Sequence, residues 1–228
     1  MIPTWLHTVS LASVALGILC AVVITGDISR NPPPMAVMAV VWPVTALFGT
    51  VLTLWLYWTY GRGRHHEDTP FWASVAKGAS HCGAGCTLGD ILAEFLCLAI
   101  PGVAVWFGWH HLFADRIFAV WIVDFLFAFA IGIAFQYCAI KPMSDLTPGR
   151  VLRQALKADA LSLTAWQVGM YGFMAFATFV LFRDRLRVDL TADTVEFWFM
   201  MQLAMLCGFV TAYPVNWGLI RAGVKEAM

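Results

Sequence analysis

Apolar residues form six long segments, which short polar stretches separate. Each segment has about the 20 residues that an α-helix needs to cross the hydrocarbon core of a bilayer. This pattern predicts an all-α fold: a polytopic membrane helix bundle of about six transmembrane helices, with residues 1–228 as a single transmembrane domain. The predicted segments are residues 5–25, 35–60, 80–107, 117–140, 160–182 and 195–220.

The third segment is too long for one straight crossing. Pro101 and Gly102 lie inside it, and a membrane helix tolerates such a pair as a kink or break. Gly85 and Gly89 lie four residues apart in the same segment, a spacing that lets two membrane helices pack closely. We therefore expect a third helix that is kinked at Pro101-Gly102 and packs tightly against a neighbour along its glycines.

Composition places the chain among integral membrane proteins. Hydrophobic residues make up 61% of it and charged residues 12%, and the mean hydropathy is +0.75. A soluble domain has about 25% charged residues. The formal net charge is zero, so the lipid bilayer is the expected partner and nucleic acid is not. The six cysteines lie in or beside apolar segments, unlike the loop cysteines of a disulfide-rich secreted protein.

Lysine and arginine predict the orientation, because they are enriched in cytoplasmic loops. With six crossings and a cytoplasmic N-terminus, nine of these residues fall in inner loops and five in outer loops. This bias predicts a multi-pass protein of the bacterial inner (plasma) membrane with both termini in the cytoplasm. The five outer residues are Arg30, Arg116, Arg183, Arg185 and Arg187.

Polar side chains form a stripe in the third segment. At 100° per residue, Cys82, Cys86, Asp90 and Glu94 fall within about 120° of one another. A carboxylate in the middle of the membrane costs several kcal/mol unless it is paired, protonated or hydrated, so such residues usually face the interior of a bundle. The stripe therefore predicts a functional site, with a purely structural buried network as the alternative.

Cys82 and Cys86 have the spacing of two ligands for one metal ion, since residues i and i+4 share a helix face. Thiolates favour soft ions such as Cu(I) or Zn(II), and a copper or zinc ion is the cofactor that they indicate. His81 is a third ligand by type, but it joins them only if the helix begins at about residue 82. Packing beside the glycines is the alternative. The candidate metal ligands are Cys82, Cys86, His81, Asp90 and Glu94.

Polar residues also interrupt the later segments. If the third, fifth and sixth helices adjoin, these residues extend the stripe into a chain of polar groups across the bilayer, which suits an ion better than an apolar substrate. The candidate residues of this ion or proton relay are Asp124, Asp159, Gln167 and Glu196.

Three blocks of the sequence resemble a known family. They are SHCGAGCTLGDILAE, KADALSLTAWQVGMYGFMA and EFWFMMQLAMLCGFVTAYPVNWGLIRAGVKEAM, and they lie in the C-terminal two-thirds of the chain. The family comprises bacterial and archaeal multi-helix membrane proteins catalogued as a domain of unknown function, with an HCGAGCTLGD block in a membrane helix. Its members often have Thr where this chain has Ala160. The resemblance implies an intact membrane module, and it supplies no activity.

These observations favour an integral membrane protein that binds and transports a cation, preferably a soft transition metal, over an enzyme. The expected partners are the bilayer and the metal ion, with a second copy of the chain or a metal-handling protein as further partners. A membrane thiol oxidoreductase using Cys82 and Cys86 is one alternative, although redox pairs usually have C-x-x-C spacing. A haem protein and an accessory subunit without chemistry are the others.

Overall fold

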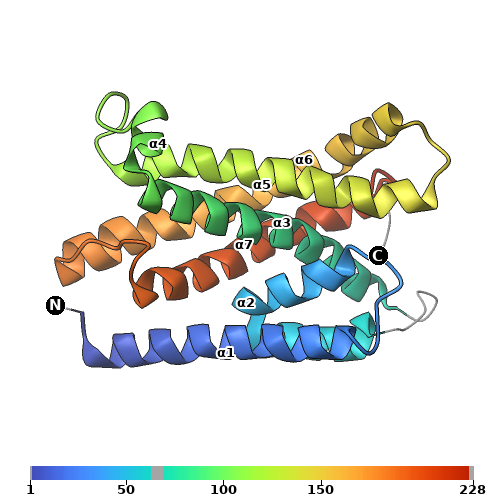
Figure 1. Cartoon of the computed structure of the whole chain (residues 1–228), viewed down its shortest axis with the longest axis horizontal. Coiled ribbons are helices and arrows are strands. Elements are labelled where there is room, and N and C mark those ends of the chain that lie inside the picture. The colour runs from blue at the N-terminus through green and yellow to red at the C-terminus, as the bar shows by residue number, and fades with distance from the viewer. Residues whose placement is uncertain (1, 63–68, 226–228) are drawn as a thin grey trace.

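The computed structural model describes residues 2–62 and 69–225, and these residues form helices and loops without a β-strand (Figure 1). Six helical stretches of this part are long and apolar enough to cross a membrane. The helices are α1 (Thr4–Ile28), α2 (Met38–Leu56), α3 (Phe71–Ala99), α4 (Pro101–Trp106), α5 (Arg116–Ile140), α6 (Pro148–Ala175) and α7 (Val195–Arg221). Short π or 3₁₀ stretches extend three of them: η1 (Tyr57–Gly61), η3 (Lys141–Met143) and η4 (Phe176–Leu186).

The helices coincide with the predicted apolar segments, but two of them begin earlier than predicted. α3 begins at Phe71, before the predicted residue 80, and α6 begins at Pro148, before the predicted residue 160. Both additions contain lysine or arginine, which interrupts the apolar pattern. The expected kink is a break, because α3 ends at Ala99 and Ile100 has extended backbone angles (φ −129°, ψ 81°) before α4 begins at Pro101.

The second predicted crossing folds back on itself within the bundle (Figure 1). Thr50 has φ 44° and ψ −122°, close to the first central position of a type II′ turn, and it reverses the direction of α2. Trp42 before the turn therefore contacts Tyr57 and Gly61 after it. Arg62 at the end of this hairpin reaches Asp27 at the end of α1, with 2.8 Å between Nη2 and Oδ1. α2 and η1 thus enter and leave the bundle at the same end.

The tip of this hairpin carries backbone groups that helical hydrogen bonds do not satisfy. Non-helical backbone at membrane depth is tolerated only where protein or a cavity surrounds it. Here the Gln202 side chain of α7 donates to the Leu47 carbonyl at 2.6 Å. The Thr53 hydroxyl donates across the hairpin to the Thr45 carbonyl at 3.3 Å. Side chains therefore replace the missing backbone partners at the turn.

The termini lie at opposite ends of the bundle (Figure 1). α1, α5 and α7 run in one direction and α3 and α6 run in the other, while α2 returns to the end at which it started. The predicted orientation, with both termini on one side of the membrane, counts residues 35–60 as a complete crossing. The reversal at Thr50 brings that segment back to the end where it started, so this arrangement favours termini on opposite sides.

α3 packs very closely on α5, as its glycines predict. A Cβ atom added to Gly85 would lie 2.8 Å from the Gly132 Cα atom of α5. One added to Gly89 would overlap the Ala128 backbone on the same helix. This close approach brings the polar stripe of α3 against the helices that carry the other predicted site residues.

Candidate intramembrane ion site

α3 is the most deeply buried helix of the bundle, with α5, α6 and α7 packed around it. Its polar stripe faces polar residues of α5 and α6. We call this set the polar ladder; its members are Cys82, Cys86, Asp90 and Glu94 of α3, Asp124 of α5, and Asp159 and Gln167 of α6. The structure therefore brings together seven of the residues that the sequence singles out.

Three carboxyl groups form the middle of the ladder. The Gln167 amide donates to Asp90 Oδ1 at 3.5 Å, and Glu94 lies one turn further along α3. Asp124 interacts electrostatically with both Asp90 and Glu94. Asp90 and Asp124 are fully buried, with no exposed surface. Among the described residues, Asp90 Oδ2 and both Asp124 oxygens have no hydrogen-bond partner.

The ladder reaches one end of the bundle through Arg116, which interacts electrostatically with Glu94 and Asp124. Glu94 and Arg116 both line a cavity of about 350 Å³ there. Arg183 and Asp115 also line it, and they form an ion pair with 2.6 Å between Nη2 and Oδ1. The cavity is thus a polar vestibule at the end of the bundle that holds the N-terminus.

A buried ion pair forms the other end of the ladder. Lys225 Nζ lies 2.7 Å from Asp159 Oδ1, and both side chains are fully buried. The same ammonium group donates to the Gly78 carbonyl of α3 at 3.3 Å. Beside it, the Asn216 amide donates to the Ser162 hydroxyl at 2.6 Å. The C-terminal segment therefore covers Asp159 and closes this end.

The two cysteines lie between the ion pair and the carboxyl groups. Both are fully buried, one helical turn apart on the same face of α3. His81 does not join them, because α3 is helical from Phe71 and His81 therefore points away from the stripe. It packs on Phe135 of α5 with 6.0 Å between ring centroids, and Asp159 and Lys225 act on it electrostatically.

The described part of the chain contains no group of three His, Cys, Asp or Glu side chains that could hold a metal ion. The condition for a Cys82–Cys86–His81 site, a helix that begins near residue 82, is not met. Asp90 and Glu94 follow the cysteines along the helix, so the five candidate ligands form a row and not one coordination sphere.

Glu196 lies apart from the ladder. Its carboxylate pairs with His7 of α1 at 2.7 Å, at the α1–α7 contact. The helical periodicity of the sequence places Glu196 on α7 but does not say which helix it meets. The structure thus assigns one of the four predicted relay residues to a different contact.

The sequence did not point to Lys225 or Arg116 as members of the site. Lys225 follows the last apolar segment, and nothing in the sequence shows that the tail folds back under α6. Arg116 begins α5, where a basic residue is typical of a membrane interface. Gln202, which holds the hairpin tip, could have been found as the one amide in the apolar run of the last helix before Asn216.

The arrangement can bind and exchange protons. Ionised carboxylates accept hydrogen bonds only, whereas a protonated carboxyl also donates one. A carboxyl group that lacks a protein donor can therefore gain and lose a proton without breaking an existing contact. From Cys82 to Glu94 the ladder spans about 18 Å along α3, which is about three-fifths of a hydrocarbon core of about 30 Å.

No curated protein and no solved structure matches the chain. A family model described as a domain of unknown function, DUF4396, matches residues 71–225. The match begins where α3 begins and includes every residue of the polar ladder together with Lys225. Because it covers more than half of the sequence, the chain belongs to the DUF4396 family.

Proposed function

We propose that this membrane protein moves a cation across the bilayer along the polar ladder, and that the cation is the proton. One observation carries the proposal: Asp90 and Asp124 are fully buried, and three of their four oxygens have no hydrogen-bond partner among the described residues. Buried ionisable groups in membrane helices are typical of proton and ion pathways.

The row-like arrangement favours a proton over a larger ion. A metal ion needs several ligands around one point, whereas a proton can pass along a row of ionisable groups, directly or through water between them. In the proposed path, protons enter at the vestibule, pass Glu94, Asp124 and Asp90, and reach Asp159. Lys225 holds Asp159 in this conformation, so passage requires that the C-terminal segment release it.

A soft metal ion at Cys82 and Cys86 is the second candidate. The i, i+4 placement of the two cysteines on α3 favours it, because two thiolates on one helix face can hold one Cu(I) ion. A thiol oxidoreductase has less support, since both sulfur atoms are fully buried and reactive cysteines are usually partly exposed.

Purified protein in liposomes tests the proton path. A pH-sensitive dye inside the vesicles reports proton entry when a potassium diffusion potential is imposed. We expect wild-type vesicles to acidify at least tenfold faster than protein-free vesicles. Asp90→Asn should abolish this gain, because a carboxamide keeps the shape but carries no exchangeable acid proton. Glu196→Gln, which changes a buried carboxyl outside the ladder, should leave the rate unchanged.

Two results would contradict the proton path. One is a wild-type rate equal to that of protein-free vesicles, and the other is an Asp90→Asn rate equal to that of the wild type. For the second candidate, protein purified without added metal should contain copper or zinc that Cys82→Ser/Cys86→Ser lacks. Equal metal contents would remove that candidate and leave the proton path untouched.

A further inference from the structure

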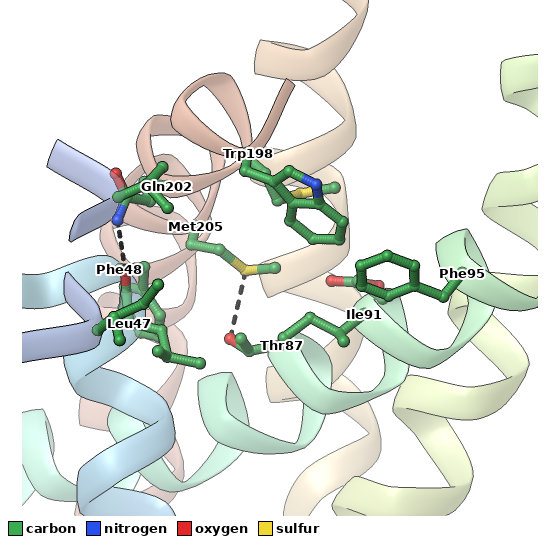
Figure 2. A pocket seen from close by; sticks show the side chains of 12 residues that line it. Leu47, Phe48, Thr87, Ile91, Phe95, Trp198, Gln202 and Met205 are labelled. Atoms are coloured by element: carbon green, nitrogen blue, oxygen red, sulfur yellow. Dashed lines mark hydrogen bonds between the residues drawn. The ribbon is translucent and has the colours of Figure 1, made fainter. Parts of the chain in front are cut away.

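The reversal of α2 leaves a pocket of about 310 Å³ beside the ladder (Figure 2). Leu47 and Phe48 at the hairpin tip line one side of it, and Thr87, Ile91 and Phe95 of α3 line another. Residues of α7 and α1 complete its walls. The pocket therefore lies beside the tip of the hairpin, between α1, α3 and α7.

The walls of the pocket are apolar, aromatic and sulfur-containing. Phe95 and Trp198 stack with 5.2 Å between ring centroids, and Phe48 lies at the hairpin tip (Figure 2). Met201 and Met205 supply thioethers, which adapt to ligands of varied shape. The volume lies at the lower end of the range of about 300–1,000 Å³ that is typical of small-molecule sites.

One polar side-chain atom of the lining has no hydrogen-bond partner in the described part of the chain. The Gln202 amide is hydrogen-bonded to Leu47 and Ser13, and the Thr87 hydroxyl to Gly83 and Met205. Figure 2 shows the bonds to Leu47 and Met205. Asp90 Oδ2 is fully buried and has no partner among the described residues, although Asp90 lines the pocket. A carboxylate in this position calls for a hydrogen-bond donor or a positive charge.

We propose that this pocket binds a lipid-soluble organic cation: a small apolar amine whose ammonium group meets Asp90 and whose body contacts the aromatic walls. The carboxylate supplies the counter-charge, and aromatic rings attract a cation placed over their faces. Ile18 and Phe95 at the rim are 53% and 51% exposed, on the surface that faces lipid. The ligand therefore enters sideways from the bilayer.

The proposed ligand is an organic cation and not a proton, so its binding can be tested without a transmembrane gradient. The protein is placed in nanodiscs of zwitterionic lipid, and its thermal unfolding is followed with two isosteric probes, 3-phenylpropylammonium and n-butylbenzene. We expect the ammonium probe to raise the unfolding temperature of the wild type by several degrees. The neutral probe should raise it by less than one degree, because it has no group for Asp90.

Three variants test whether this shift depends on Asp90 and on the space inside the pocket. Asp90→Asn should lose the shift, whereas Glu196→Gln, which removes a carboxyl of α7 outside the pocket, should keep it. Val14→Trp fills the pocket from α1 while every ladder residue is kept, and it should also lose the shift. If Asp90→Asn does not fold, the two probes and Val14→Trp still decide.

Equal stabilisation by the two probes would overturn the proposal and make the pocket a site for lipid chains. A full shift in Val14→Trp would overturn it as well, because the cation would then bind elsewhere. If the wild type shows the probe shift but no proton flux above that of protein-free liposomes, the result contradicts the proton path alone.

Discussion

At the scale of single residues, the Asp159–Lys225 pair makes the sharpest prediction about stability. Both side chains are fully buried, so removing one leaves an uncompensated charge. Breaking such a pair typically costs about 3–5 kcal/mol. We therefore expect Lys225→Met to lower the free energy of unfolding by about that amount, measured by titration with a denaturing detergent.

Arg221 provides the matched control, because it lies at the same end of α7 but at the surface. Its guanidinium group lies over the Trp217 ring, 5.0 Å from the centroid, and such exposed contacts contribute about 0.5–1 kcal/mol. Arg221→Met should cost no more than this. Adding Asp159→Asn to Lys225→Met should recover most of the loss, since no charge is then left unpaired. Equal costs for Lys225→Met and Arg221→Met would show that the pair is not buried.

The residues of the stripe could be predicted because helical periodicity depends only on the sequence. Cys82, Asp90 and Glu94 share a face on any regular helix. Lys225 and Gln202 could not be found in this way, because their partners lie on other helices and depend on tertiary packing. The direction of His81 depends on where α3 begins, and the sequence does not fix that boundary.

At the scale of helices, the close packing of α3 on α5 predicts that the cost of adding a methyl group depends strongly on which glycine receives it. A Cβ atom on Gly89 would overlap the Ala128 backbone, which cannot move aside cheaply. We expect Gly89→Ala to lower the free energy of unfolding by about 1–3 kcal/mol. Gly172→Ala on the exposed face of α6, with no atom within 4 Å, should change it by less than about 1 kcal/mol. Equal losses in the free energy of unfolding for Gly89→Ala and Gly172→Ala would exclude the close contact between α3 and α5.

The turn in α2 makes a separate prediction. A β-branched residue at φ 44° is strained, and such strain costs about 1–3 kcal/mol. Thr50→Gly relieves it, whereas Thr50→Ala keeps a Cβ atom and most of the strain. The free energy of unfolding of Thr50→Gly should therefore be about 1 kcal/mol higher than that of Thr50→Ala. A more stable alanine variant would mean that α2 is straight at this position.

The extents of most helices could be predicted, but the reversal could not. Residues 35–60 have the length and hydropathy of a full crossing, and Gly49-Thr50 is an ordinary pair in a membrane helix. What decides the turn is tertiary: Gln202 of α7 supplies the hydrogen bond that the tip needs.

At the scale of the whole molecule, the opposite positions of the termini change the predicted orientation. Of the lysines and arginines in the described residues, four lie near the end with the N-terminus and nine near the other end. The four are Arg116, Arg183, Arg185 and Arg187. Because basic residues mark the cytoplasmic side, we propose that the C-terminus is cytoplasmic and the N-terminus is outside.

Reporter fusions at the two termini test this orientation. A fluorescent protein that folds only in the cytoplasm should be active when fused at Met228 and inactive when fused at Met1. A reporter that is active only outside the cytoplasm should give the reverse pattern. Cytoplasmic signals from both termini would mean that α2 crosses the membrane completely.

The central claim is that the ladder is one continuous path, and proton flux in a double-variant cycle on Asp90 and Asp124 tests it most directly. Two members of one path act as a unit, so their effects do not add. We predict that Asp90→Asn, Asp124→Asn and the double variant all fall to the same rate, that of protein-free liposomes, while each remains folded. Two partial losses that multiply in the double variant would contradict a single path through both carboxyl groups.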